Sequence, residues 1–267
     1  MGYSVAVMAP QEIQSLGTPR PEPEGTSPAA SPVTLVTGSV RGLGLAVACA
    51  CAERGDRTHI VWRGSAGAAS EAEAVFAPRV HRADLTRSAD AKKLVGDVIA
   101  RDGRLDHVVH CVGAYTSGPL VETSFDDWRR MFESNLETSL HLAAGVRDAL
   151  RASCGTLVFF GCAGLEGLGG RRQAAAYAAA KSALLVFARS LALEEATHGV
   201  RVNMLSPGIV PHQDAHPDTE SPKRLASIPL GRVGTPAEIA EACLWLSSPK
   251  SSYTLGQNLT VSGGWLI

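Results

Sequence analysis

Short runs of β-branched and aliphatic residues alternate with longer segments of helical composition from Val33 to the C-terminus. The runs that predict strands are Val33–Thr37, Thr58–Trp62, Val80–Arg82, Leu105–Cys111, Thr156–Phe160, Val200–Leu205 and Gln257–Val261. Between the first of these runs, Gly42–Arg54, Ser65–Phe76 and Ser88–Arg101 have the composition of helices. The pattern therefore predicts about seven strands, each separated from the next by a helix or a long connection.

Strands that alternate with helices of this length require right-handed crossovers, which build a parallel sheet covered on both faces. We therefore expect an α/β fold, a doubly wound and mostly parallel seven-stranded Rossmann-type sheet. One domain would span residues 33–267. Residues 1–32 hold 6 of the 15 prolines and few large apolar side chains, which predicts a disordered tail.

Composition and charge narrow the classes of partner. Hydrophobic residues make up 45% of the chain and charged residues 19%, which suits a sizeable buried core. A net charge of −1 gives no overall field toward nucleic acid or an anionic membrane. No apolar stretch reaches the roughly 18 residues of a membrane span, and no secretion signal is visible. We expect a cytoplasmic protein.

The six cysteines are scattered and form no Cys-x-x-Cys pair. They are Cys49, Cys51, Cys111, Cys154, Cys162 and Cys243. This spacing favours neither a metal site nor a disulfide framework, and it suits a reducing cytosol. We interpret most of these thiols as small buried hydrophobic groups, and we expect no metal.

A glycine-rich turn follows the first predicted strand. Gly38 allows a tight turn, Gly42 allows close approach to a pyrophosphate, and Gly44 allows close helix packing. Ser39, Arg41 and Leu43 lie between these glycines. Phosphates would bind at the helix N-terminus, where unpaired N–H groups favour negative charge. A purely structural glycine turn is the alternative, but the position between a strand and a helix favours a dinucleotide.

The spacing Thr-Gly-x-x-x-Gly-x-Gly from Thr37 to Gly44 resembles the short-chain dehydrogenase/reductase family, and the resemblance extends from Val33 to the C-terminus. At the end of the second strand, where an NAD enzyme usually has an acidic residue, this chain has Arg63. Arg63 and Arg41 could together clamp a 2′-phosphate, which predicts NADP(H). Arg63 as an ordinary solvated residue is the alternative.

The resemblance also implies further cofactor contacts. Asp84 and Leu85 would flank the adenine, and Gly113 would follow the fourth strand near the adenosine side. Pro207, Gly208 and Ile209 would border the nicotinamide.

Tyr177 and Lys181 lie four residues apart in a segment of helical composition and would share one helix face. A nearby ammonium favours the phenolate and lowers the pKa of a phenol, which makes Tyr177 a candidate proton donor to a carbonyl oxygen. By resemblance, Lys181 would also hold the cofactor ribose. Asn135 would hold a water that links Lys181 to solvent, with a buried structural amide as the alternative.

The chain departs from the family pattern at three places. The family's serine, about 13 residues before the tyrosine, falls on Gly164, whereas a two-residue insertion around Gly169–Arg172 would place Cys162 there. A thiol is a weak donor. The family's Asn-Asn-Ala-Gly is here His110-Cys111-Val112-Gly113. The threonine often found shortly after Pro207-Gly208 is missing. These departures predict a slow enzyme, another donor or an unusual substrate.

The segment from Pro211 to Ser227 would cap the substrate. It is short and polar and carries His212 and His216, which we interpret as solvated loop residues rather than ligands.

We expect an NADPH-dependent enzyme, ketoacyl- or polyketide-ketoreductase-like, that reduces a ketone to a secondary alcohol. A silent NADP(H)-binding protein and a non-redox dehydratase or cyclase on the same fold are the alternatives. The partner would be a small carbonyl compound, and the family implies a homotetramer or homodimer.

Overall fold

The computed structural model describes residues 31–64, 66–167, 169–211 and 221–266. The tail expected over residues 1–32 lies outside them apart from its last two residues, as do His212 and His216. Pro32 belongs to the compact unit Pro32–Ile267, because its carbonyl accepts the N–H of Arg57 at 2.8 Å.

Seven strands form one parallel sheet in the order β3-β2-β1-β4-β5-β6-β7. They are β1 (Val33–Thr37), β2 (Arg57–Trp62), β3 (Val80–Arg82), β4 (His107–His110), β5 (Thr156–Phe160), β6 (Arg201–Pro207) and β7 (Asn258–Val261). The order reverses between β1 and β4, so a crevice is expected outside the carboxyl ends of these strands. This arrangement confirms the predicted single-domain doubly wound sheet.

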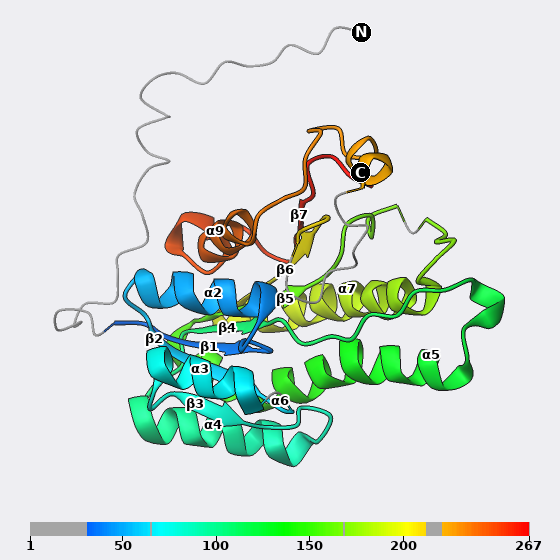
Figure 1. Ribbon diagram of the computed structural model, residues 1–267. Helices are drawn as coiled ribbons and strands as arrows, with labels where there is room; N and C mark the ends of the chain where they lie inside the picture. Colours follow the sequence, from blue (N-terminus) through cyan, green and yellow to red (C-terminus); the bar gives the residue numbers. More distant parts are fainter. Residues whose placement is uncertain (1–30, 65, 168, 212–220, 267) are drawn as a thin grey trace, which may run out of the picture. The chain divides into compact units, whose positions relative to one another are not determined.

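Helices cover both faces of the sheet (Figure 1). They are α2 (Gly42–Glu53), α3 (Ala66–Phe76), α4 (Ser88–Asp102), α5 (Phe125–Phe132), α6 (Thr138–Ser153), α7 (Ala175–Glu195), α8 (Pro222–Leu225) and α9 (Pro236–Leu246). Buried side chains of α4, α6 and α7 share one core cluster, which includes Leu94, Leu142 and Leu184. Those of α2, α3 and α9 share the other, which includes Val47 and Ile239.

One segment, Ala175–His198, is long and apolar enough to cross a membrane by length and composition alone. This segment contradicts the expectation that no apolar stretch reaches the length of a membrane span. It includes α7, whose Leu184, Leu185 and Ala188 are buried in the core against the sheet. A helix that forms part of a core passes the same test, so we describe α7 as a core helix.

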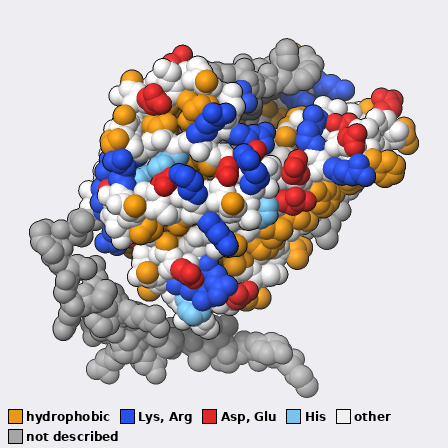
Figure 2. All heavy atoms as spheres, turned by 90° about the horizontal axis from the view of Figure 1, so that it is seen from below, with side chains coloured by type: hydrophobic (Ala, Val, Ile, Leu, Met, Phe, Trp, Pro, Cys, Tyr) orange, Lys and Arg blue, Asp and Glu red, His pale blue; other side chains and the backbone are white. Residues whose placement is uncertain are grey.

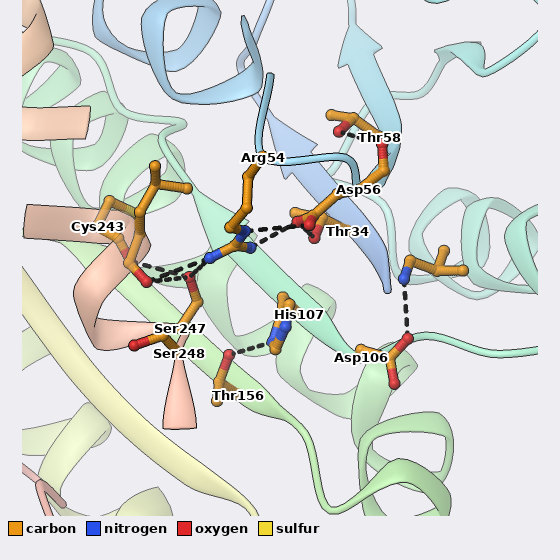
Figure 3. A network of polar contacts seen from close by, with 12 residues as sticks. Thr34, Arg54, Asp56, Thr58, Asp106, His107, Thr156, Cys243, Ser247 and Ser248 are labelled. Atoms are coloured by element: carbon orange, nitrogen blue, oxygen red, sulfur yellow. Dashed lines mark hydrogen bonds and ion pairs between the residues drawn. The ribbon is translucent and has the colours of Figure 1, made fainter. Parts of the chain in front are cut away.

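At the amino ends of the strands, polar side chains form a closed network (Figure 3). Asp56 accepts from Arg54 Nε at 3.0 Å and from the Thr34 hydroxyl at 2.6 Å. Asp106 accepts from the Val33 N–H at 2.8 Å. His107 Nδ1 lies 2.9 Å from the Thr156 hydroxyl. The network ties the starts of β1, β2, β4 and β5 together.

A second cluster at the same edge is centred on Asp102, which is nearly buried. Asp102 accepts from Arg79 Nε at 2.7 Å, from Arg57 Nη1 at 3.0 Å and from His59 Nε2 at 2.7 Å. The hydrogen bond from Arg79 is the largest cause that lowers the pKa of Asp102. Burial lowers the pKa of His59 to about 4, so its ring is neutral near pH 7. His59 Nδ1 therefore accepts from His81 Nε2, 2.8 Å away.

Figure 2 shows the face seen from below, on which basic and acidic side chains are interspersed. No large area of a single sign of charge is visible on this face, in keeping with the net charge of −1.

Candidate active site

The turn from β1 to α2 has the geometry of a phosphate cradle. Gly38 and Gly42 adopt positive φ angles of 68° and 57°, which favour glycine. A Cβ on Gly44 would lie 2.2 Å from the Gly38 carbonyl oxygen, so the turn and the helix require a glycine there. No side chain caps the N-terminus of α2, where Arg41 is the N-cap residue. The first N–H groups of this helix are thus available to an anion.

Ser39 lies in this turn, but its hydroxyl serves the fold. It donates to the Val36 carbonyl at 2.6 Å and accepts from the Val61 N–H at 2.9 Å, and the residue is fully buried. The Ser39 side chain therefore joins β1 to β2 rather than facing a ligand. The side chain of Leu43 is partly buried and packs against the core cluster that α2, α3 and α9 share.

Beyond the end of β2, Arg63 and Asp84 lie together. The Arg63 side chain is 67% exposed, and its Nη1 is 3.4 Å from Asp84 Oδ1. Burial alone would raise the pKa of Asp84, but hydrogen bonds from Thr86 and Arg63 lower it. The side chain of Leu85 is buried in the core, so only its backbone can face an adenine.

Sequence reasoning missed a further guanidinium at this end of the site. Arg82 lies 5.3 Å from the centroid of the Trp62 ring and donates to the Arg63 carbonyl at 3.3 Å. The face of an aromatic ring attracts a guanidinium, and this attraction holds the Arg82 side chain in position. The signal in the sequence was its position at the end of the third strand.

Tyr177 and Lys181 lie on the first turns of α7. The Lys181 Nζ is buried, donates to the Phe160 carbonyl at 2.6 Å and lies 5.9 Å from the centroid of the Tyr177 ring. The thiol of Cys162, two residues beyond the end of β5, lies close enough to the Tyr177 hydroxyl for each group to shift the pKa of the other. The structure therefore brings Tyr177, Lys181 and Cys162 together.

Burial controls the protonation of these three groups. It raises the pKa of Tyr177, and the neighbouring Cys162 and Tyr115 raise it further. It also raises the pKa of Cys162, so the thiol is neutral. Burial lowers the pKa of Lys181 to about 8. Near pH 7 the site thus holds a protonated phenol beside an ammonium that loses its proton more readily than an exposed lysine.

Asn135 lies in a π-helical turn (Glu133–Glu137) that precedes α6. Its Nδ2 donates to the carbonyls of Ala114 and Met131, each at 3.0 Å, whereas its buried Oδ1 has no hydrogen-bond partner. A Cβ on Gly113 would lie 2.3 Å from this Oδ1 and 3.2 Å from Lys181 Nζ. Gly113 therefore leaves room between the amide and the ammonium, and the unsatisfied oxygen is suited to a bound water.

The residues expected to border the nicotinamide follow β6. Gly208 N–H donates to the Val261 carbonyl at 2.9 Å, and a Cβ there would lie 2.6 Å from Ser262 Cα. Close packing against the segment after β7 is thus sufficient to explain this glycine. Pro207 accepts from Ala163 N–H at 3.0 Å and Ile209 from Gly234 N–H at 2.9 Å, which fixes the loop at the carboxyl edge.

His110, which replaces the family's first asparagine, is buried at the end of β4. Its Nδ1 is 2.7 Å from the Thr37 hydroxyl and its Nε2 is 3.2 Å from the Thr138 hydroxyl. Thr138 donates to the Ser134 carbonyl, so it accepts from Nε2–H, and Nδ1 accepts from Thr37. Burial lowers the pKa of His110 to about 3. His110 therefore joins β1, β4 and α6, as a packing role predicts.

Two more side chains near Tyr177 were not singled out from the sequence. The Tyr115 ring meets the Tyr177 ring edge-on, with centroids 5.1 Å apart. Arg171 donates to the carbonyls of Ala163 and Gly164. The only signal was the inserted segment around Gly169–Arg172. Among the described residues, no group of three or more His, Cys, Asp or Glu side chains could hold a metal ion.

A glycine turn at a helix N-terminus and a Tyr–Lys pair at the carboxyl edge of a doubly wound sheet define a dinucleotide-dependent oxidoreductase. The family model described as enoyl-(acyl carrier protein) reductase matches residues 38–266. The chain belongs to the short-chain dehydrogenase/reductase family, an enzyme family that binds a nicotinamide cofactor and interconverts carbonyls and alcohols.

Relatives and solved structures agree with this assignment. The chain is 34% identical to L-fucose dehydrogenase of Oryctolagus cuniculus, over 88% of this chain and 85% of that protein. It is 31% identical to 3-oxoacyl-[acyl-carrier-protein] reductase FabG of Salmonella typhimurium, over 87% and 96%. A short-chain type dehydrogenase/reductase from Mycobacterium ulcerans superposes with a TM-score of 0.80 at 29% identity, over 87% and 89% of the two chains.

Proposed function

We propose that the protein reduces a ketone to a secondary alcohol with NADPH. The observation that carries this proposal is the Tyr177–Lys181 pair, in which the buried Lys181 ammonium lies one helical turn from Tyr177 and 5.9 Å from the centroid of its ring. When bound, the cofactor supplies the hydride. The protein supplies the proton and the geometry.

Tyr177 is the proton donor in this proposal. Burial raises the pKa of its hydroxyl, contrary to the lowered pKa expected from the sequence, so the phenol is protonated at neutral pH and is a weaker acid than a free phenol. The negative charge that develops on a bound carbonyl oxygen would draw the proton from it. The Lys181 ammonium favours the phenolate that remains. The unpartnered Oδ1 of Asn135 lies beside Lys181, where a water would carry the next proton in from solvent.

Cys162 stands in this proposal where the family's serine stands. The thiol and the Tyr177 hydroxyl shift each other's pKa, which is consistent with a thiol beside the donor hydroxyl. Counting 13 residues back gives Gly164, but the inserted segment displaces the count. A neutral thiol is a weak hydrogen-bond donor, so we expect a slow reaction on simple ketones. The same weakness favours the silent NADP(H)-binding protein as the second candidate function.

The residues of the cofactor end fit a dinucleotide. The uncapped start of α2 would hold the pyrophosphate, with Gly38, Gly42 and Gly44 as its cradle. Arg63, with Arg41 and Arg82 in neighbouring segments, would hold a 2′-phosphate, because guanidinium groups form charge-assisted hydrogen bonds with phosphate.

The decisive experiment follows NADPH oxidation over a panel of cyclic, oxoacyl and polyketide-like ketones. Turnover of at least one ketone supports the proposal, and NADPH binding without any turnover supports the silent binding protein. For the cofactor, we expect the unmodified protein to have a lower dissociation constant for NADPH than for NADH. Arg63→Asp should reverse this order, so that NADH binds more tightly than NADPH. Arg129→Asp, a change at an exposed arginine of α5, should leave the order unchanged. Equal affinities in the unmodified protein would refute the NADPH preference.

We also propose a cytoplasmic homodimer or homotetramer that acts on small molecules and binds no nucleic acid or membrane. On α7, Val186 and Leu193 are 65% and 77% exposed and lie seven residues apart on one face. Light scattering of the unmodified protein and of Leu193→Glu would test whether this face joins two copies.

A further inference from the structure

Arg171 lies beside the proposed proton donor. Its Nη2 donates to the Ala163 carbonyl at 2.7 Å and to the Gly164 carbonyl at 3.0 Å. Ala163 directly follows Cys162, whose thiol influences the pKa of Tyr177. The guanidinium is therefore bonded to the backbone of the residue next to Cys162.

Gly164 makes room for this guanidinium. A Cβ on Gly164 would lie 2.4 Å from Arg171 Nη2 and 3.2 Å from its Cζ. Gly164 also has a φ of +77°, a conformation that side chains rarely adopt. Any larger residue at this position would displace the arginine.

The segment that carries Arg171 is fixed on its C-terminal side, and the carbonyls to which its guanidinium donates lie next to β6. Gln173 forms a β-bridge with Pro119, in the loop that follows β4. Ala163 is in turn tied to β6 through the Pro207 carbonyl. The guanidinium is thus held in a half-buried, defined position, although it belongs to a connection without regular structure.

The charge of Arg171 is not matched by a carboxylate among the residues that the structure describes. Several other arginines there do form such pairs, including Arg151 with Glu195 and Arg189 with Glu166. The two hydrogen bonds that Arg171 donates to described residues use Nη2 alone, which leaves Nη1 and Nε for another acceptor. A half-buried cation held by two neutral carbonyls gains by meeting an anion.

The same charge acts on the reactive groups. Arg171 is among the causes that lower the pKa of Tyr177 and of Cys162, although burial outweighs it at both. Because Arg171 is bonded to the backbone next to Cys162 and its charge acts on Tyr177, an anion bound at Arg171 would lie near the reacting carbonyl.

We propose that Arg171 binds an anionic group of the substrate and selects ketones that carry a carboxylate or a phosphate near the reacting carbon. This inference rests on the proposed function and specifies its substrate class. Nη1 would donate charge-assisted hydrogen bonds to an oxygen of the anion while Tyr177 faces the carbonyl oxygen. Arg171 thus acts as a specificity residue, and the proton still comes from Tyr177.

Matched probes with and without the charge test this proposal. The carboxylate arm compares 2-oxo, 3-oxo and 4-oxo acids with their methyl esters. The phosphate arm compares dihydroxyacetone phosphate with dihydroxyacetone. The measured quantity is the ratio of kcat/KM for the charged and the neutral member of each pair. Comparison of the two arms tells a carboxylate from a phosphate.

In the unmodified protein, we expect the ratio to exceed one in at least one arm. Arg171→Gln should lower this ratio on the order of 10- to 100-fold, because it removes the partner of a desolvated charge. Arg171→Lys keeps the charge and should retain part of the preference. Arg172→Gln, at the exposed neighbouring arginine, should leave the ratio unchanged. A ratio at or below one in both arms, or one that Arg171→Gln does not change, overturns the proposal.

A binding measurement separates this inference from the proposed function. The complex with NADPH cannot react with a hydroxy acid, because both are reduced, so calorimetric titration with 3-hydroxybutanoate and its methyl ester measures recognition alone. In one outcome, the protein binds the acid more tightly than the ester, loses this preference in Arg171→Gln, and yet oxidises no NADPH with any ketone. That result would refute the redox function and support the anion site. Turnover of neutral ketones with no preference for the acid would do the reverse.

Discussion

The two edges of the sheet differ in how their polar groups are paired. At the amino ends of the strands, Asp56 (Figure 3) and Asp102 are each bonded to two or more donors. At the carboxyl ends, the buried Oδ1 of Asn135 has no partner and Arg171 has no matching carboxylate in the described part of the chain. Both edges come from the same seven strands.

This difference separates the groups that hold the fold from those that await a ligand. A buried polar group without a partner costs free energy, so a fold retains one only where a ligand or water supplies the missing bond. Groups whose partners lie within the fold, which are the carboxylates of the amino edge and also His110, should therefore respond to mutation through stability. The groups at the carboxyl edge without such partners should respond through activity. Each of the following predictions tests that division.

Tyr177→Phe should have the largest effect on activity. The ring and its contact with Tyr115 remain, and only the proton donor is lost, so kcat should fall on the order of 10²–10⁴-fold. NADPH affinity and the melting temperature should change little. Steady-state kinetics and a thermal melt measure both, and a Phe variant with near-normal kcat would assign the proton to another group.

Asp102→Ala should have the largest effect on stability. It leaves Arg79, Arg57 and His59 without their acceptor, and removal of one partner from a buried pair costs about 3–5 kcal/mol. Denaturant unfolding measures the loss, and kcat at a permissive temperature should be retained. Asp97→Ala, which breaks an exposed pair with Lys93, should cost less than about 0.5 kcal/mol. If the two changes lowered the free energy of unfolding equally, the Asp102 cluster would not stabilise the fold more than an exposed ion pair does.

The buried histidines should make the fold sensitive to acid. The pKa values of His59 and His110 are lowered to about 4 and about 3, so the unfolded chain binds more protons than the native one from pH 6.5 down to these values. The free energy of unfolding should therefore fall as pH decreases through this window, on the order of 1–2 kcal/mol per histidine between pH 7 and 5.

His110→Asn should reduce this loss, because the amide can accept from Thr37 and donate to Thr138 but does not titrate. Urea unfolding at several pH values measures the slope. His198→Asn, at an exposed position, is the matched control. An unchanged slope in His110→Asn would mean that this ring does not contribute.

Cys162 should show the smallest effect. A serine hydroxyl is a stronger donor than a thiol, so Cys162→Ser should raise kcat on a simple ketone and Cys162→Ala should lower it, each by roughly tenfold at most. If Ala leaves kcat unchanged and Ser only lowers the melting temperature, Cys162 belongs to the packing of the fold and not to the reactive centre.

Local patterns were enough to predict much of the molecule. The predicted strand Val33–Thr37 and the predicted start of the helix at Gly42 agree with the structure to the residue, because both follow from short runs of apolar residues and a glycine turn. The fourth strand was predicted too long, as Leu105–Cys111 rather than His107–His110. Leu105 and Cys111 are apolar like the valines of the strand itself, and only the pairing with β1 and β5 decides where the strand begins and ends.

By itself, the sequence determined the alternation of strands and helices, the phosphate turn and the Tyr177–Lys181 spacing, since each depends on residues close together in the chain. Only the tertiary structure decided that the Ser39 hydroxyl serves the fold, that Cys162 reaches Tyr177, and that Gly164 admits Arg171. Each of these contacts joins residues from different segments, and the distance between such segments in space cannot be predicted from a local sequence pattern. They depend on how the loops at the carboxyl edge pack against one another, and that packing exists only once the sheet has formed.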